Sequence, residues 1–162
     1  MLSITPVSDW PIPEFEDLVH ESRQEGFRFM ERLDEEWLSG ANRFSKVGEA
    51  LFAVFDDGKL VAVGGINRQS DECGRLRHFY VITAVRRRGV GRLLEQHILA
   101  FASVHYTHIV LRTNTEVGEL FYESLRFLRL PPGDDATHRL NLVSSRKPRS
   151  RRPGRAERPL HR

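Results

Sequence analysis

The sequence is poor in cysteine and in long apolar runs. Cys73 is the only cysteine among 162 residues, which excludes an internal disulfide and a metal site built from several cysteines. The longest apolar runs are residues 50–55 and 98–102, far short of the roughly 20 residues that span a bilayer. The first twenty residues also lack the basic and apolar segments of a secretory signal. We therefore expect a cytoplasmic protein that makes no membrane contact.

Charge is unevenly distributed along the chain. Residues 146–162 contain eight Lys or Arg and one Glu, whereas the other 145 residues contain 17 basic and 21 acidic side chains. Apolar residues are nearly missing from the C-terminal stretch, which predicts disorder there. The sequence thus predicts one domain over residues 1–144 and a basic tail over 145–162. The tail could bind nucleic acid weakly through phosphate charge, but it lacks interleaved aromatics that would stack on bases.

Hydrophobic periodicity predicts a mixed α/β domain with one central sheet. A tight Asp57-Gly58 turn favours a β-hairpin in the middle of the domain. The expected elements, in order, are a strand at 4–7, helices at 15–22 and 27–38, hairpin strands at 51–55 and 60–66, a strand at 76–82, a helix at 90–102, a strand at 109–111, a helix at 120–125, and closing strands at 127–130 and 137–142.

The junction between the strand at 76–82 and the helix at 90–102 is the most informative segment. It contains Gly89 and Gly91 with arginines on both sides. Glycine lets the backbone approach a ligand, and the free N–H groups of a helix's first turn bind phosphate. A dinucleotide-binding turn would need a third glycine where Leu94 stands, and a Walker loop is absent. The segment predicts a phosphorylated ligand held by main-chain groups.

Two motifs connect this junction with a known family. The pattern Arg86-x-x-Gly89-x-Gly91 resembles the coenzyme A signature [QR]-x-x-G-x-[GA] of the GNAT superfamily, the acetyl-coenzyme A-dependent N-acyltransferases. A later segment is similar to the family's N-x-x-x-A-x-x-[LF]-Y-E-x-x-G-F pattern, and it reads Asn114-x-x-x-Gly118-x-x-Phe121-Tyr122-Glu123-x-x-Arg126-Phe127. Gly118 replaces the usual alanine, and Arg126 replaces the glycine that ends the helix. The resemblance implies a mostly antiparallel, twisted sheet of six to seven strands flanked by about four helices.

The same resemblance implies how acetyl-coenzyme A would bind. Backbone N–H groups from Arg87 to Arg92 would hold the pyrophosphate, and two of the four nearby arginines are expected to contact phosphate. The strand before the signature would offer main-chain groups to the pantetheine arm. Asn114 would hydrogen-bond that arm, or else serve as a turn or cap residue. The expected cofactor-binding residues are Phe79, Tyr80, Val81, Arg86, Arg87, Arg88, Gly89, Val90, Gly91, Arg92, Asn114 and Phe121.

Tyr122 is the candidate catalytic residue. In the family the matching tyrosine commonly acts as general acid toward the coenzyme A thiolate, and the alternative is a packed helix tyrosine. A main-chain N–H near Val81 would meet the oxyanion. The general base is open: His78 and Glu72 are weak candidates, and water or the N-terminal helices are the alternatives.

Strand alternation bears on the acceptor. It places Arg75, Arg77, Phe79 and Val81 on one face, and it places Leu76, His78, Tyr80 and Ile82 on the other. Arginines facing the acceptor would suit a small amine that carries an anionic group; alternatively each arginine pairs with a nearby acid. Phe27 and Trp37 are candidate lining residues, although most aromatics there are expected in the core.

The sequence therefore favours an N-acetyltransferase that acts on a primary amine of a small molecule by direct transfer. No metal and no covalent enzyme intermediate are expected, and the protein would be a monomer or homodimer. One alternative is a protein N-terminal or lysine acetyltransferase. Another, of a different class, is a non-catalytic coenzyme A-binding sensor or scaffold.

Overall fold

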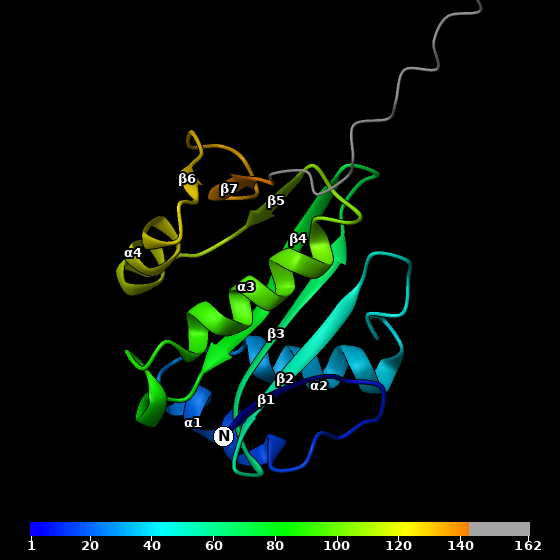
Figure 1. Cartoon of the computed structure of the whole chain (residues 1–162), viewed down its shortest axis with the longest axis vertical. Coiled ribbons are helices and arrows are strands. Elements are labelled where there is room, and N and C mark those ends of the chain that lie inside the picture. Colours follow the sequence, from blue (N-terminus) through cyan, green and yellow to red (C-terminus); the bar gives the residue numbers. More distant parts are fainter. Residues whose placement is uncertain (143–162) are drawn as a thin grey trace, which may run out of the picture.

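The structure, a computed structural model, describes residues 1–142 as one seven-stranded sheet with helices around it (Figure 1). The predicted tail and residues 143–144 of the predicted domain lie outside the described residues. No helix within residues 1–142 is long and apolar enough to cross a membrane. The elements are β1 (Leu2–Pro6), α1 (Phe15–Gln24), α2 (Phe29–Ser39), β2 (Ala50–Asp56), β3 (Lys59–Arg68), β4 (Cys73–Val81), the 3₁₀ turn η1 (Thr83–Val85), α3 (Val90–Ala102), β5 (His108–Leu111), α4 (Glu116–Ser124), β6 (Leu128–Arg129) and β7 (His138–Asn141).

The sheet follows the order β1-β2-β3-β4-β5-β7-β6. Every neighbouring pair is antiparallel except β4 and β5, which run parallel. The expected mixed α/β fold with a mostly antiparallel sheet of six to seven strands and about four helices is confirmed. The predicted hairpin is present too: Asp57 and Gly58 both adopt left-handed backbone conformations between β2 and β3, as a tight hairpin turn requires.

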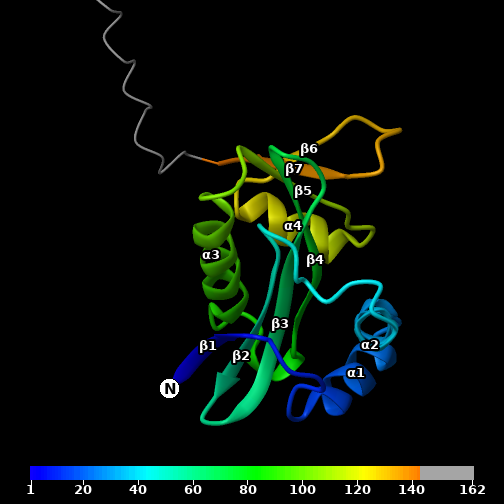
Figure 2. The same ribbon diagram turned by 90° about the vertical axis from the view of Figure 1, so that its right-hand side faces the viewer.

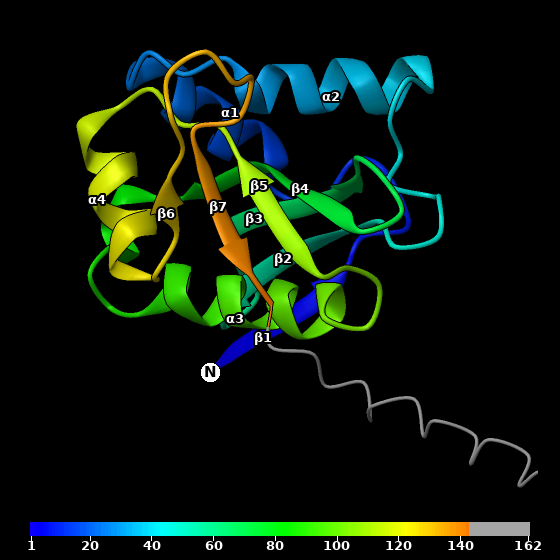
Figure 3. The same cartoon turned by 90° about the horizontal axis from the view of Figure 1, so that it is seen from above.

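Helices cover both faces of the sheet. Figure 2 shows α3 on one side of β2, β3 and β4, with α1 and α2 on the other, and Figure 3 shows the same arrangement from above. Their inward residues recur every three to four positions, as the sequence predicted. These buried residues are Phe15, Leu18 and Ser22 in α1, Met30, Leu33 and Trp37 in α2, and Leu94, Ile98 and Ala102 in α3.

Strands β4 and β5 stay together only briefly. Residues 73–75 of β4 pair with residues 108–110 of β5, and β4 then continues for six residues without a strand partner on that side. The unpaired stretch leads directly through η1 into the loop before α3. The fold therefore leaves one strand edge open beside the arginine- and glycine-rich junction.

A β-bulge corrects the alternation expected along β4. Arg77 pairs with Gly65 and Tyr80 with Val63, so β4 has one residue more than β3 across this step, and His78 takes a left-handed φ of 54°. Arg77 and His78 both contact Glu36 in α2, and Tyr80 reaches Glu25 on the same side. A bulge shifts the side chains that follow it to the other face.

Phe79 and Val81 consequently lie on the opposite side from Arg77, toward α4 and α3. The Phe79 ring centroid is 5.8 Å from that of Phe121, and Val81 borders Gly91. The expected grouping of Arg77 with Phe79 and Val81, and of His78 with Leu76, was therefore wrong.

Helix α4 begins with a cap that leaves no room for a larger residue at Gly118. The Thr115 hydroxyl accepts a hydrogen bond from the Gly118 N–H at 3.0 Å. A Cβ at Gly118 would collide with Thr113 Oγ1 and lie 2.9 Å from Thr115 Oγ1. At the other end, Arg126 adopts a φ of 72°, so it takes the left-handed conformation expected where the family pattern has glycine.

We expect Gly118→Ala to destabilise the domain by about 1–3 kcal/mol through overpacking, although alanine is the better helix former by about 1 kcal/mol. Urea unfolding monitored by circular dichroism measures this. Thr113→Ala removes the first clashing hydroxyl, so the double variant should recover part of the loss. A Gly118→Ala variant as stable as the parent would show that the cap is not this tight.

Candidate functional site

The loop before α3 presents a row of unused amide groups. Arg87 and Gly89 have left-handed φ values of 65° and 81°, which turn the chain so that α3 starts directly after Gly89. Within residues 1–142, the N–H groups of residues 87 to 92 donate no hydrogen bond to any backbone or side-chain acceptor. Free N–H groups at a helix N-terminus bind anions, because the helix dipole adds positive potential there.

Arginine side chains reinforce that potential. Arg87, Arg88 and Arg92 are exposed and form no ion pair within the described chain, and the first turn of α3 contains no acidic residue. A phosphate group at this loop would therefore meet positive charge with no competing carboxylate on the helix. The predicted junction thus has the geometry of an anion site.

Unlike Arg87, Arg88 and Arg92, Arg86 binds groups of the protein itself. Its Nη atoms lie 2.8 Å and 2.5 Å from the two Glu25 carboxylate oxygens, and its Nε donates to the Val81 carbonyl at 2.9 Å. The guanidinium also sits over the Tyr80 ring, 5.4 Å from its centroid. The hydrogen bond from Arg86 holds the pKa of Glu25 below its usual value. Arg86 therefore anchors the loop to the connection between α1 and α2.

Aromatic side chains occupy the opening between β4 and α4. The ring centroids of Phe79, Phe121 and Tyr122 lie 5.1–6.1 Å from one another. Gly91 in α3 makes this packing feasible, because a Cβ there would lie only 3.1 Å from the Phe121 ring. The two glycines of the junction thus differ in purpose: Gly89 supplies a left-handed turn, and Gly91 supplies room.

The Tyr122 hydroxyl has no hydrogen-bond partner within residues 1–142. Burial, with a smaller contribution from the charge of Glu95, raises the pKa of the Tyr122 phenol well above its usual value. A phenol of this kind stays protonated at neutral pH and can donate a hydrogen bond or a proton. Its position on α4 beside Phe79 brings it close to the open part of β4.

Glu95 is a residue that the sequence reasoning missed. It lies one turn after Gly91 on the inward face of α3, is 3% exposed, and its Oε1 atom has no hydrogen-bond partner in the described chain. Burial raises the pKa of the Glu95 carboxyl to about 7, against a smaller opposing effect of Arg92. The only signal in the sequence is its spacing from Gly91 and Ile98, which puts it on the buried stripe.

Asn114 lies between β5 and α4 and is exposed, and its side chain makes no hydrogen bond within residues 1–142. Thr115, its neighbour, caps α4. Thr115, and not Asn114, is therefore the N-cap residue of α4, and the Asn114 amide remains available to a ligand.

On the other face of β4, the arginines are paired. Arg75 donates to Asp135 at 2.7 Å, and Arg77 donates to Glu36 at 3.2 Å. The alternative in which each arginine pairs with a nearby acid is confirmed. An anionic group on the acceptor would have to displace one of these carboxylates.

The candidate bases are poorly placed for direct proton abstraction. His78 is buried, with Nδ1 2.9 Å from the Phe29 carbonyl oxygen and Nε2 3.0 Å from Glu36. Burial and the charge of Arg77 hold the pKa of His78 below its usual value. Glu72 precedes β4 and lies beside Thr107, at the opposite end of the strand from the α3 loop.

The two aromatic lining candidates differ. Trp37 is 8% exposed and stacks on Trp10 with ring centroids 4.9 Å apart, so it belongs to the core and its predicted lining role was wrong. Phe27 is half-buried and packs beside Phe29, with ring centroids 5.3 Å apart.

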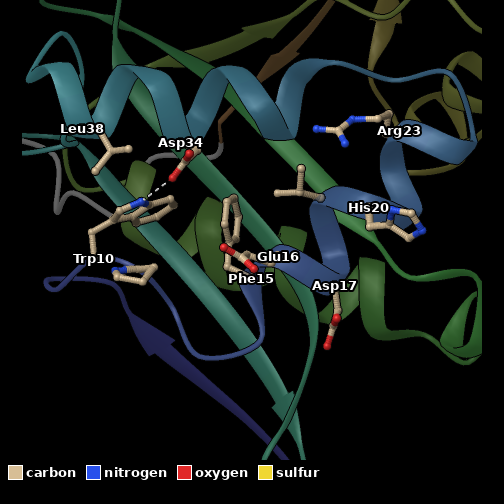
Figure 4. Close-up of a pocket in the computed structure, with 10 residues that line it drawn as sticks. Trp10, Phe15, Glu16, Asp17, His20, Arg23, Asp34 and Leu38 are labelled. Carbon is tan, nitrogen blue, oxygen red and sulfur yellow. Dashed lines mark hydrogen bonds between the residues drawn. The ribbon is translucent and has the colours of Figure 1, made fainter.

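A separate hollow of about 660 Å³ lies between α1 and α2 (Figure 4). Trp10 borders it and donates a hydrogen bond from Nε1 to Asp34 at 2.8 Å. The hollow shares no residue with the α3 loop or with α4. It is thus distinct from the candidate anion site.

Comparison with known proteins shows which family has this fold. The acetyltransferase (GNAT) family model matches residues 6–127. The structure of a presumed acetyltransferase from Exiguobacterium sp. 255-15 is 31% identical, covers 87% of this chain and 93% of its own, and has a TM-score of 0.77. The comparison with curated proteins found no match. The fold and loop define an acyltransferase. The chain belongs to the acetyltransferase (GNAT) family.

More distant structures share the fold. An acetyltransferase from Streptococcus agalactiae 2603 is 18% identical with a TM-score of 0.71, covering 88% of this chain and 98% of its own. The ribosomal-protein-S18-alanine N-acetyltransferase from Escherichia coli is 17% identical with a TM-score of 0.64, covering 93% and 98%.

Burial of an unpaired carboxyl at Glu95 makes stability depend on pH. The folded state binds this proton more tightly than the unfolded state, because the pKa rises from 4.5 to about 7 on folding. The contribution is therefore fully present below about pH 4.5 and is lost as pH rises through 7. Glu95→Gln should be more stable than the parent by about 1–3 kcal/mol at pH 8, with the difference shrinking below pH 5. Urea unfolding at both pH values measures it, and a difference independent of pH would contradict this burial.

Proposed function

We propose that this protein transfers an acetyl group from acetyl-coenzyme A to a primary amine of a small molecule. The observation that carries the proposal is the row of unpartnered N–H groups at residues 87–92, placed between unpaired arginines at the start of α3. A pyrophosphate carries the negative charge and the acceptor oxygens that such a row requires.

The neighbouring residues suit the rest of the donor. The edge of β4 beyond Arg75 has no strand partner, so an extended amide-bearing arm can hydrogen-bond to it as a further strand would. Asn114, between β5 and α4, is exposed, and its side-chain amide makes no hydrogen bond within residues 1–142. Together with the loop, these groups would bind acetyl-coenzyme A along β4 from the α3 N-terminus.

Tyr122 would act at the reacting thioester. The amine nitrogen forms a bond to the acetyl carbon, the carbon–sulfur bond breaks, and the Tyr122 hydroxyl gives its proton to the departing sulfur. The amine loses its extra proton to water, since the candidate bases are buried or remote. A main-chain N–H near Val81 would stabilise the developing negative charge on the carbonyl oxygen.

The contacts between β4 and the α1–α2 connection favour a small acceptor. Glu25 binds Arg86 and Tyr80, and the Phe29 carbonyl lies against His78. These contacts fix the connection across β4, whereas an extended peptide needs an open groove. One structure that shares the fold is the ribosomal-protein-S18-alanine N-acetyltransferase from E. coli. The test below therefore also includes peptide acceptors.

We expect coenzyme A to bind the folded protein with heat detectable by isothermal titration calorimetry. The triple change Arg87→Ala, Arg88→Ala, Arg92→Ala should weaken binding at least tenfold, because each lost charge-assisted hydrogen bond contributes roughly 1.5–3 kcal/mol at most. Lys59→Ala, in the β2–β3 hairpin, is the control. Absence of binding by the unaltered protein would refute the donor site.

We expect Tyr122→Phe to lower kcat by about 100-fold with little change in KM for acetyl-coenzyme A, in line with the contribution of a general acid. Thiol release is measured with small primary amines and with peptides that carry a free N-terminus or lysine. Turnover with small amines supports the proposal, and turnover with peptides alone favours the protein-directed alternative. Coenzyme A binding without turnover on any amine indicates a sensor or scaffold.

A further inference from the structure

Within residues 1–142, Glu95 Oε1 is the only fully buried side-chain nitrogen or oxygen atom that has no hydrogen-bond partner. Its neighbours on the inward face of α3, Leu94 and Ile98, are fully buried and apolar. A buried carboxyl without a hydrogen bond costs stability. Folding does not explain its presence, whereas residues that reduce stability often serve activity.

The surroundings of Glu95 connect it with Tyr122. Gly91 lies one turn earlier on the same face of α3, so close to Phe121 that a Cβ there would lie 3.1 Å from the Phe121 ring. Phe121 directly precedes Tyr122. Of the charged groups in the described chain, Glu95 is the one whose charge acts on the Tyr122 phenol. The Tyr122 hydroxyl is itself without a hydrogen bond there. Glu95 and Tyr122 therefore lie on the two helices that approach each other at Gly91 and Phe121, and both groups lack a hydrogen-bond partner in the described chain.

Few other charged groups affect the pKa values of Glu95 and Tyr122. Arg92, from α3, is the only charged side chain in residues 1–142 that acts on Glu95, and α4 contributes Tyr122. Strand β4 contributes apolar side chains, with Phe79 beside Tyr122 and Val81 beside Gly91. The protonation of Glu95 thus depends on its burial and on Arg92.

We propose that Glu95 is a positioning and proton-supplying residue that acts through Tyr122. In the donor-bound protein the neutral Glu95 carboxyl would hydrogen-bond to the Tyr122 hydroxyl, a contact that the free protein does not make. When Tyr122 gives its proton to the departing sulfur, the carboxyl proton moves to the Tyr122 oxygen. Glu95 then takes a proton from water, and the pair is restored for the next transfer. This inference rests on the proposed function.

Donor binding would strengthen this arrangement. Arg92 favours the charged form of Glu95 in the free protein. A phosphate group seated at the α3 N-terminus would engage Arg92 and reduce that effect, since opposite charges placed close together partly cancel. The Glu95 proton is consequently held more tightly when the donor is bound.

Glu95→Gln separates these roles, because the amide keeps the shape and one hydrogen bond but cannot transfer a proton. We expect about a tenfold loss in kcat and less than a threefold change in KM for acetyl-coenzyme A. We also expect the parent's kcat to fall as pH rises through the Glu95 pKa of the donor-bound protein, and this fall should be lost in the variant. In a Tyr122→Phe background the same change should have no further effect, since the two residues act as a unit. Glu116→Gln, exposed in the first turn of α4, is the control.

A second readout does not depend on turnover. Carbon NMR of the labelled Glu95 carboxyl should show titration near pH 7 in the free protein, moving to higher pH when coenzyme A is added. Titration near pH 4.5, or no movement on adding coenzyme A, overturns the proposal. So does a Glu95→Gln variant with the parent's kcat and pH profile, or one in which only KM changes, which would make Glu95 a ligand of the pantetheine arm.

The two proposals can fail separately. If the protein binds coenzyme A but turns over no amine, the proposed function fails, and the carboxyl titration still decides whether Glu95 and the donor site are coupled. If amines are acetylated and Glu95→Gln behaves as the parent does, only the role of Glu95 is lost.

Discussion

The short pairing between β4 and β5 is the constraint on which the rest of the molecule depends. Three residues of each strand are in register before the strands part. Had the pairing continued, β4 would be a central strand with both edges used, and no extended ligand could bind along it. The separation instead exposes main-chain groups beside the loop that starts α3. The aromatic cluster of Phe79, Phe121 and Tyr122 packs in this region.

Electrostatics and packing act together at the start of α3. The left-handed turn at Gly89 aims unused N–H groups outward, and the anchor from Arg86 to Glu25 fixes the loop that carries them. One turn further along, the helix buries Glu95 on its inward face. The same helix thus presents positive potential at its exposed end and, about one helical turn away, a buried carboxyl whose pKa is raised.

Much of the fold could be predicted from the sequence. The helix at 90–102 has the predicted bounds, and the hairpin turn at Asp57-Gly58 lies where expected, because period and turn chemistry are local signals. The alternation along β4 failed, since no glycine or asparagine announces the left-handed backbone at His78. A bulge of this kind depends on the neighbouring strand and on α2.

The site was predictable only in part, because several of its contacts join distant parts of the chain. Gly89 and Gly91 indicate the loop, but nothing in the sequence shows that Arg86 binds Glu25, which lies 61 positions earlier. The spacing of Glu95 from Gly91 and Ile98 puts it on the inward face of α3, but the sequence does not show that its carboxyl is left without a hydrogen-bond partner.

The central claim is that main-chain amides at the start of α3 hold the pyrophosphate of coenzyme A. Amide proton–nitrogen NMR spectra recorded during a coenzyme A titration test it most directly. The account predicts that the N–H signals of residues 87–92 move most, with saturation at the affinity found by calorimetry. Binding that leaves these signals in place while moving those of the α1–α2 hollow would contradict it.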